Sequence, residues 1–258
     1  MARVTRLEPV YRERIWGTTN LAPYFPNPDR KIGEVWFQPS DQFPLLIKFL
    51  FTSERLSVQV HPEDAYALER ENSRGKTEMW HILAVEPDAT IALGFRERVS
   101  EAQIRKAIGD GTLEQLLNWV PVQPGEAYFA EAGVVHAIGG GIVLCEIQQN
   151  SDVTYRLYDY NRPRELHVEK SLAVAKLEPY DGRRQYPVTC QYFTTELLQA
   201  TQQVLPDKNA DSVVVVLAGT GQLDGERFEP GQAWLLPGNA GDVEVQADSS
   251  ATLLRASC

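Results

Sequence analysis

Four residues between positions 59 and 136 have side chains that can bind a metal ion. Gln59 and His61 are two positions apart in LSVQVHP, an alternating stretch typical of a β-strand, so both side chains point to one face. Glu78 begins the stretch EMWHIL, and His136 follows a glycine turn in EAGVVHAIGGG. Two imidazoles, one carboxylate and one amide oxygen form a coordination set suited to zinc. We therefore predict that the four side chains converge on one divalent cation inside a barrel.

Positively charged residues stand near these candidate ligands. Lys48 interrupts the apolar stretch PLLIKFLF, where a charge is costly to bury unless it meets a partner or a ligand. Arg156 lies in the polar segment EIQQNSDVTYRLYDYNR, and its planar guanidinium suits an oxyanion or a phosphate. With Lys76, these residues predict a local positive patch. The walls of the cavity would be three tyrosines of the same segment, Tyr155, Tyr158 and Tyr160.

Each residue also has a less specific interpretation. A single histidine on a strand is more often packed or exposed than bound to metal, and Glu78 alone could be a solvated strand end. His81 alternates to the opposite face from Glu78, and His167 lies in the charged stretch RELHVEK, so we exclude both as ligands. Glu146 can turn inward from CEIQQ, which makes it a candidate proton-transferring base.

The elements that position these residues are predicted to be mainly short β-strands. Apolar runs such as LSVQV, TIALGF, GIVLCEIQQ and SVVVVLAG alternate with turns rich in proline and glycine, a spacing typical of an all-β sandwich or barrel. The segment SEAQIRKAIGDGTLEQLLNWV instead predicts two short helices near residues 100–118, with Ser100 as the N-cap. The stretch Ser171–Leu177 fits a helix or a strand.

An internal repeat indicates two related β-barrel modules. PGEAYFAEAG at Pro124–Gly133 resembles PGQAWLLPGNAG at Pro230–Gly241. All four histidines precede residue 168, so a histidine-based metal site belongs to the first module. We expect residues 1–178 to form the metal-binding module, with the helical insertion, and residues 179–258 to form a smaller module without metal ligands.

Composition excludes some classes of protein. Lys and Arg number 25 against 35 Asp and Glu, a formal charge of −10 that argues against nucleic-acid binding. No apolar run approaches the length of about 18 residues that a membrane helix needs, and MARVTRLEPVYRER lacks the apolar core of a signal peptide. The three cysteines form no CxxC motif. We expect a cytoplasmic protein, a monomer or weak homo-oligomer, that binds a small molecule and no membrane.

Several ordered blocks carry a family resemblance. PLLIKFLFTSERLSVQVHPEDAYA, GKTEMWHIL, AGVVHAIGGG and EIQQNSDVTYRLYDYNR together resemble the type I mannose-6-phosphate isomerases, in particular the short bacterial form. YRERIWGTTNL and IGEVWF near the N-terminus extend the likeness, which is strong from about residue 8 to 170 and weaker beyond. The resemblance implies a cupin fold of two jelly-roll modules, one zinc ion per chain, and interconversion of mannose 6-phosphate and fructose 6-phosphate through an enediol.

The resemblance also implies roles for particular residues. The zinc ligands fall on the four residues named above: Gln59, His61, Glu78 and His136. The active-site arginine falls on Arg156, the two pocket lysines on Lys48 and Lys76, and a pocket serine on Ser57. We expect Arg156, Lys76 and Glu146 to take part in catalysis, and Lys48, Ser57 and Lys76 to hold substrate.

Departures from the family pattern and rival functions remain open at this point. Gly75 stands where long members carry a histidine, so a base assigned to that histidine does not transfer. Glu131 replaces the proline of the usual PAG turn. Two histidines and a carboxylate also suit an iron-dependent cupin oxygenase. A non-catalytic sugar-phosphate-binding cupin is the other alternative.

Overall fold

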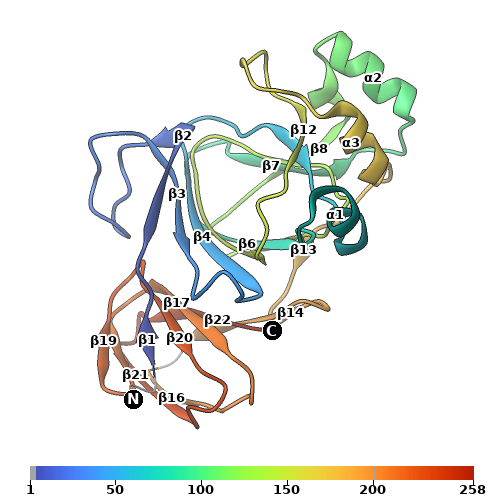
Figure 1. The fold of residues 1–258 in the computed structure, drawn as a ribbon. Coiled ribbons are helices and arrows are strands. Elements are labelled where there is room, and N and C mark those ends of the chain that lie inside the picture. The colour runs from blue at the N-terminus through green and yellow to red at the C-terminus, as the bar shows by residue number, and fades with distance from the viewer. Residues whose placement is uncertain (1–3, 200) are drawn as a thin grey trace.

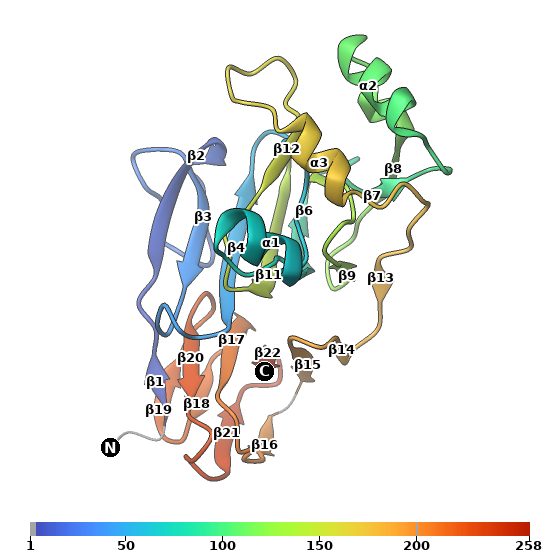
Figure 2. The same cartoon turned by 45° about the vertical axis from the view of Figure 1, so that its right-hand side comes forward.

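The computed structural model describes residues 4–199 and 201–258 as a mostly β protein with few helices (Figures 1 and 2). The strands form four antiparallel sheets, two built mainly from the N-terminal part of the chain and two from the C-terminal part. Figure 1 shows the C-terminal strands, in orange and red, below the rest of the molecule. The predicted predominance of strands is confirmed. In the described ranges, no helix has the length and apolar character needed to cross a membrane.

A seven-stranded sheet is the larger of the two sheets in the N-terminal part. Its order is β13-β9-β6-β11-β4-β3-β2. Its strands, in chain order, are β2 (Val10–Thr18), β3 (Ile32–Phe37), β4 (Leu45–Thr52), β6 (Glu78–Val85), β9 (Ala127–Ala130), β11 (Ile142–Gln149) and β13 (Arg183–Arg184).

A five-stranded sheet faces it, in the order β12-β5-β10-β7-β8. Its strands are β5 (Val58–Val60), β7 (Thr90–Phe95), β8 (Leu117–Pro121), β10 (His136–Ile138) and β12 (Tyr155–Tyr158). Apolar side chains of both sheets fill part of the space between them, including Trp80, Leu144, Ile91 and Ile138.

The C-terminal part repeats this arrangement with a six-stranded sheet, β1-β20-β17-β22-β15-β14, and a four-stranded sheet, β16-β21-β18-β19. The N-terminal strand β1 pairs with β20 and so lies among the C-terminal strands (Figure 1). The strands are β1 (Thr5–Arg6), β14 (Val188–Thr189), β15 (Thr194–Gln199), β16 (Gln202–Leu205), β17 (Ser212–Ala218), β18 (Gly221–Leu223), β19 (Glu226–Phe228), β20 (Ala233–Leu236), β21 (Val243–Ala247) and β22 (Thr252–Ser257).

Strand alternation decides which residues reach the space between the N-terminal sheets. In β4, Ile47 and Phe49 join the core shared with the six-stranded sheet, so Lys48 between them points to the opposite side. In β11, Cys145 and Ile147 likewise face the shared core. Glu146 therefore points to the same side as Lys48, and the two are direct cross-strand partners.

Within the described residues, the N-terminal part has three α-helices and one 3₁₀-helix: α1 (Asp64–Glu71), α2 (Glu101–Gly109), η1 (Leu113–Leu116) and α3 (Val168–Val174). The predicted insertion is present as α2 and η1, and Ser100 caps α2 through a capping box with Gln103. The stretch Ser171–Leu177, for which the sequence favoured neither helix nor strand, begins within helix α3, which ends at Val174. Residues of α2 and α3 pack on the outer face of the five-stranded sheet, which leaves its inner face for the site.

Candidate metal centre

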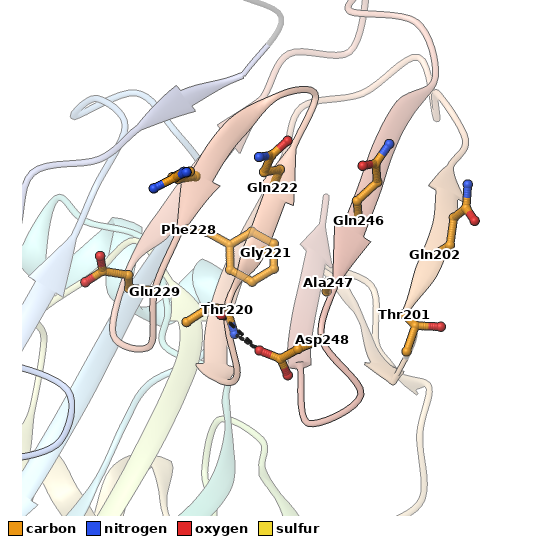
Figure 3. Close-up of a pocket in the computed structure, with 11 residues that line it drawn as sticks. Thr201, Gln202, Thr220, Gly221, Gln222, Phe228, Glu229, Gln246, Ala247 and Asp248 are labelled. Atoms are coloured by element: carbon orange, nitrogen blue, oxygen red, sulfur yellow. Dashed lines mark hydrogen bonds between the residues drawn. The ribbon is translucent and has the colours of Figure 1, made fainter.

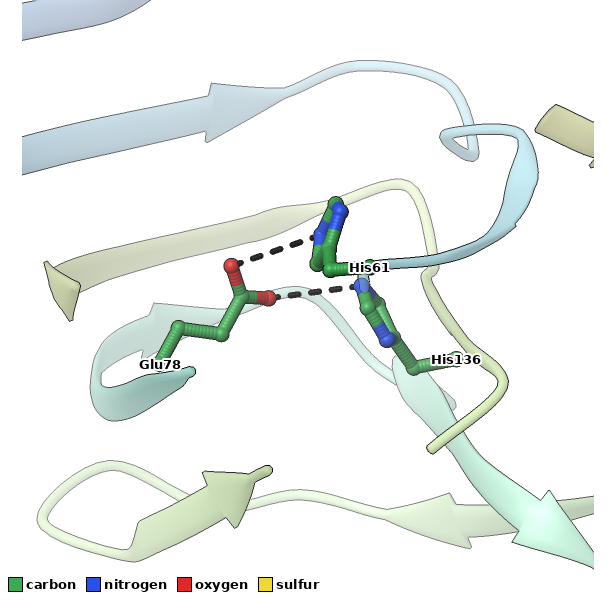
Figure 4. A group of neighbouring side chains, drawn as sticks. All are labelled: His61, Glu78 and His136. Atoms are coloured by element: carbon green, nitrogen blue, oxygen red, sulfur yellow. Dashed lines mark ion pairs between the residues drawn. The ribbon is translucent and has the colours of Figure 1, made fainter. Parts of the chain in front are cut away.

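His61, Glu78 and His136 converge between the two N-terminal sheets (Figure 4). Their ligand atoms all lie within 4.8 Å of one another, and all three side chains are buried. Oε1 of Glu78 is 3.3 Å from Nε2 of His136, and Oε2 is 3.6 Å from Nε2 of His61. Ligand atoms about 2.0–2.2 Å from a tetrahedral ion are separated by about 3.3–3.6 Å. The carboxylate of Glu78 therefore lies at the separation of a fellow zinc ligand from each of the two histidines.

Three strands from the two opposed sheets bring these groups together. Glu78 begins β6 in the seven-stranded sheet, whereas His136 begins β10 in the five-stranded sheet. His136 pairs directly with Gln59 of β5, and Gln59 pairs with Arg156 of β12. These three residues form a cross-strand row whose side chains share one face. His61 follows the end of β5, two positions beyond Gln59.

Both histidines are held in the tautomer that a metal ligand needs. Nδ1 of His61 lies 2.9 Å from the carbonyl oxygen of Val153, and Nδ1 of His136 lies 2.9 Å from that of Val134. Nδ1–H donates to the carbonyl in each case, so Nε2 keeps its lone pair and faces Glu78. Burial lowers the pKa of both imidazoles, and for His61 the nearby charge of Lys76 lowers the pKa further. Neutral imidazole is the form that binds metal.

Gln59 supplies a fourth group at this cluster. Its amide nitrogen lies 3.2 Å from Nε2 of His136. The amide has an oxygen and a nitrogen on the same carbon, so a half-turn about its last bond presents the oxygen instead. All four residues predicted from spacing are thus adjacent, and the amide needs only this rotation to offer its oxygen.

Lys76 lies next to the carboxylate of Glu78. Its ammonium nitrogen is 2.8 Å from Oε2 of Glu78 and 3.1 Å from Nε2 of His61. Among the described residues, neither oxygen of Glu78 accepts a hydrogen bond of good geometry, although Oε2 forms an ion pair with Lys76. Burial opposes the charge on Lys76, but Glu78 and Glu146 outweigh it and raise the pKa of this ammonium. A buried carboxylate with unsatisfied oxygens fits a cation-binding role.

A second charged group lies beside the cluster, on the seven-stranded sheet. Glu146 of β11 stands between Lys48 of β4 and Trp80 of β6 in cross-strand register. Its Oε1 is 3.1 Å from Nζ of Lys48, and its Oε2 accepts a hydrogen bond of 3.0 Å from Nε1 of Trp80. Burial alone would raise the pKa of Glu146, but Lys48 and Lys76 outweigh it and lower that pKa. The carboxylate is therefore ionised at neutral pH.

A cavity of about 350 Å³ lies beside the cluster, and the neighbours of the cluster, Gln59 and Lys76, line it. Arg156 lines it, makes one hydrogen bond of 2.9 Å from Nη1 to the carbonyl of Glu165, and has a buried Nε without a partner among the described residues. Arg156 therefore keeps donors for an anionic ligand. The residues that line the cavity are Arg14, Trp16, Glu34, Lys48, Leu50, Leu56, Ser57, Gln59, Lys76, Ile138, Glu146, Asp152, Thr154, Arg156 and Arg164.

The excluded histidines lie elsewhere. Nδ1 of His81 is 2.8 Å from the hydroxyl of Tyr186, on the opposite face of β6 from Glu78. Nδ1 of His167 accepts a hydrogen bond from the backbone of Arg156. The predicted tyrosine walls are wrong. Alternation along β12 turns Tyr155 to the face opposite Arg156. A register shift between Arg156 and Tyr158 puts Tyr158 on the same side as Tyr155. With Tyr160, which follows the strand, both pack in the apolar cluster that contains residues of α2 and α3.

Sequence reasoning missed several residues that line the cavity or contact its lining. Trp80 stands two positions after Glu78, so strand alternation could have placed it on the ligand face, but its apolar neighbours concealed the role of its indole N–H. Arg14 lies on the edge strand β2, and Asp152 and Arg164 lie in loops. Loops have no side-chain period, so no pattern in the sequence points to the last two residues.

A second, larger hollow of about 750 Å³ lies on the exposed face of the sheet β16-β21-β18-β19 (Figure 3). Gln202, Gln246 and Gln222 stand in one cross-strand row on this face, and Thr220 donates two hydrogen bonds to Asp248. Its lining residues include no histidine, cysteine or lysine. The polar side chains point to solvent, as expected for the wet face of an antiparallel sheet. We therefore place the chemistry in the N-terminal cavity.

The chain is similar in sequence to several mannose-6-phosphate isomerases. The chain is 33% identical to mannose-6-phosphate isomerase ManA of Bacillus subtilis, over 93% of this chain and 94% of the relative. It is 35% identical to a mannose-6-phosphate isomerase of Streptococcus mutans, over 82% of this chain and 75% of the relative. No protein-family model matches the chain.

Solved structures give the same result. The crystal structure of the mannose 6-phosphate isomerase from Bacillus subtilis superposes with a TM-score of 0.87 and 29% identity, and covers 97% of this chain and 98% of that one. A zinc-bound mannose 6-phosphate isomerase, 17% identical over 99% of each chain, superposes with a TM-score of 0.78 and shows the same fold. On the strength of the sequence matches, this chain belongs to the mannose-6-phosphate isomerase family.

Proposed function

We propose that the protein is a zinc-dependent aldose–ketose isomerase that interconverts mannose 6-phosphate and fructose 6-phosphate through an enediol. The observation that carries this proposal is the buried His61–Glu78–His136 cluster in contact with Lys76, which also lines a cavity with other lysines and arginines. A divalent ion and fixed cations together suit a sugar phosphate, whose reaction develops negative charge on oxygen. The matched relatives carry the same activity in their names.

The residues present fit one zinc ion per chain. His61, Glu78 and His136 would hold it through two nitrogens and a carboxylate oxygen, and Gln59 would complete the set through its amide oxygen. The ion, when bound, supplies a Lewis acid that polarises the carbonyl end of the sugar. A zinc-bound structure with the same fold supports the choice of metal.

The proton transfer between C1 and C2 of the sugar requires a base and a group that stabilises the enediolate. Glu146 is ionised and lies between two fixed donors, so it can accept a proton in a defined direction. Arg156 lines the cavity and has an Nε without a partner among the described residues, and it would stabilise the oxyanion. Lys76 reaches both the metal cluster and the cavity, where it would orient or protonate a sugar oxygen. Lys48 and Ser57 would hold the sugar.

Two cupin-type modules are the architecture we propose for this activity, divided as residues 1–178 and 179–258. The repeated stretches support it, because they form equivalent strands, β9 and β20, that follow glycines with φ of 89° and 87°. Strand β1 contributes to the second module from the first segment of the chain. The metal residues all belong to the first module.

The proposed setting is the cytoplasm, with a hexose phosphate as the only required partner. The free thiols support a reducing compartment, since Cys145, Cys190 and Cys258 form no disulfide. The acidic composition supports the absence of a nucleic-acid partner.

A chelation experiment tests the proposed function. Purified protein should isomerise mannose 6-phosphate in a coupled assay, lose activity after chelation, and regain it with one equivalent of zinc per chain. Metal analysis gives the zinc content independently of turnover. Activity that persists in metal-free protein would contradict the proposal, as would oxygen uptake in place of isomerisation.

A further inference from the structure

Besides Arg156, four cationic side chains that line the N-terminal cavity lie at two depths. The side chains of Lys48 and Lys76 are 3% and 5% exposed and lie beside the metal cluster. The side chains of Arg14 and Arg164 are 33% and 28% exposed, although both line the same cavity. The lysines therefore lie at the bottom of the cavity, and the two arginines lie at its mouth.

The substrate of the proposed reaction has two ends with different needs. C1 and C2 react and must reach the metal cluster, while the phosphate is attached to C6 at the far end of the carbon chain. A phosphate is strongly hydrated, so a partly exposed position costs less desolvation than a buried one. This chemistry places the phosphate near the mouth of the cavity.

Arg164 is held in a single orientation by a buried carboxylate. Asp159, whose side chain is 1% exposed, accepts hydrogen bonds of 2.6 Å from both Nε and Nη2 of Arg164. Nη1 of Arg164 has no hydrogen-bond partner within the described ranges. One edge of the guanidinium is thus fixed by protein, while N–H groups on the other edge stay free for a bidentate contact with an anion.

Arg14 is fixed in a similar way from the other sheet. Its Nη2 is 2.7 Å from Oε2 of Glu34, and Nη1 donates to the carbonyl of Glu13 at 3.2 Å. Oε2 of Glu34 is itself held by Nε1 of Trp36 at 2.9 Å. Two arginines whose rotamers are already restricted lose little conformational entropy when they bind a ligand.

We propose that Arg14 and Arg164 form the mouth of the substrate site and bind the phosphate group of the sugar. Asp159 and Glu34 are positioning residues that orient the two guanidinium groups. This inference rests on the proposed function for the identity of the sugar, but the predicted anion site can be tested without turnover. The deep lysines are then left for the reacting end of the sugar.

Steady-state kinetics separate this role from catalysis. Arg164→Gln and Arg14→Gln should each raise KM for mannose 6-phosphate about tenfold to a hundredfold, the range for one lost charged hydrogen-bonding group. Turnover at saturation should change less than about threefold, because neither arginine contacts the reacting carbons. Arg164→Lys keeps the charge without the planar fork and should give a smaller rise in KM.

Binding of inorganic phosphate gives a second measurement that needs no catalysis. Calorimetric titration should show phosphate binding to the zinc-loaded protein, and each glutamine variant should weaken it by about the factor found for KM. Zinc content should be equal in all variants. Arg98→Gln is the matched control, since Arg98 forms an exposed ion pair with Glu178 away from the cavity and should leave every value unchanged.

The proposal is wrong if KM and phosphate affinity are unchanged in both glutamine variants. It is also wrong if the variants lose turnover while KM stays constant. Phosphate that binds the variants as tightly as the native protein must bind elsewhere, such as at the metal. If the native protein fails to isomerise mannose 6-phosphate, the proposed function fails, and the phosphate titration still decides whether the arginines form an anion site.

Discussion

The N-terminal and C-terminal sheet pairs have the same strand order but different interiors. Outward from the repeated strand β9 the order is β6, β11, β4, and outward from its counterpart β20 it is β17, β22, β15. The facing sheets also correspond, as β5-β10-β7-β8 and β16-β21-β18-β19. In the C-terminal pair, apolar side chains fill the space between the sheets, among them Val214, Leu223, Phe228 and Val245.

The register shows where the two interiors diverge. Glu78 pairs with the last residue of β9, and Ser212 pairs with the last residue of β20. Two residues further along, Trp80 pairs with Glu146, whereas Val214 pairs with Arg255. The carboxylate that would bind metal is thus a serine in the second pair, and the candidate base is an arginine.

Between the two halves, the buried charged residue and its cross-strand partner both change sign. Glu146 pairs across strands with Lys48, and Arg255 pairs with Glu196, so the signs are exchanged. Arg255 donates to the hydroxyl of Ser212 at 3.2 Å, which ties together the two positions that differ most. The same backbone therefore supports a charged row in both halves, and in the N-terminal half a cavity between the sheets and two buried histidines accompany it.

The N-terminal half should be functionally distinct because it binds metal, so removal of one metal ligand should have the largest effect on activity. His136→Ala should remove bound zinc and lower turnover by about a thousandfold or more, because the loss of several kcal/mol of charge stabilisation has that size. Metal analysis and the coupled assay check the two results together. Full activity without metal would refute the assignment of the ligands.

A matched pair of substitutions compares the two equivalent charged positions. Glu146→Gln should lower turnover by about a hundredfold to ten-thousandfold, the usual contribution of a general base, while zinc stays bound. The new amide oxygen can still accept the hydrogen bond from Trp80. Kinetics and metal content measured on the same preparations check both expectations.

Arg255→Gln is the counterpart in the second half. It should leave turnover per folded molecule unchanged and lower the free energy of unfolding by about 1–3 kcal/mol, since its hydrogen bond to buried Ser212 is disturbed. Urea unfolding measures the change. An equal loss of turnover in the two variants would show that the difference between the halves is not catalytic.

Strand alternation explains how much of the candidate site the sequence could reveal. Gln59, His61, Glu78 and Lys48 lie on or next to strands, where a period of two assigns each side chain to a face. The pairing of distant strands, such as β5 with β10, depends on contacts between residues far apart in the chain and has no local signal. This is why the row that joins Gln59 to Arg156 emerged only from the structure.

Sequence patterns also fail to identify functional residues in loops and polar groups on largely apolar side chains. Arg164 and Asp159 follow the end of β12, where no periodicity applies, and their ion pair joins positions five apart through a local turn. Trp80 looked like a core residue because most of its surface is apolar. The helical insertion was predictable since the N-cap, the capping box and the glycine breaks all act locally.

A buried titratable residue, His81, also lies outside the two sheet interiors, at the interface between the N-terminal and C-terminal halves. His81 lies on the face of β6 opposite the metal cluster, and burial lowers its pKa to about 4. In the unfolded chain this residue has the ordinary histidine pKa of about 6.5. As the pH falls, the unfolded state therefore binds a proton before the folded state does. The free energy of unfolding decreases as a result between about pH 6.5 and pH 4. Between pH 7 and pH 5 the loss should be about 2 kcal/mol.

His81→Phe isolates this contribution. Urea unfolding at the two pH values should show that the substituted protein loses about 2 kcal/mol less stability than the native protein over the same range. Its stability at pH 7 should fall slightly, because the hydroxyl of Tyr186 loses its partner. Parallel pH dependence in the two proteins would contradict the shifted pKa.

The smallest effect should come from a single hydrogen bond inside the N-terminal interior. Trp80→Phe keeps an aromatic ring beside His136, whose ring centre is 5.4 Å away, but removes the 3.0 Å hydrogen bond to Glu146. The carboxylate then loses a donor that favours its charged form, so its pKa should rise and the acidic limb of the kcat/KM profile should move to higher pH.

Turnover of Trp80→Phe should fall about tenfold, which corresponds to about 1.4 kcal/mol, the usual size of a hydrogen bond to a charged group. Trp119→Phe is the control, since its indole donates to the carbonyl of Glu114 outside the cavity. The aligned position in the C-terminal half is Val214, whose side chain offers no donor to Arg255. If both tryptophan variants keep native turnover and the same acidic limb, the indole acts only in packing, and the two interiors differ in their charges alone.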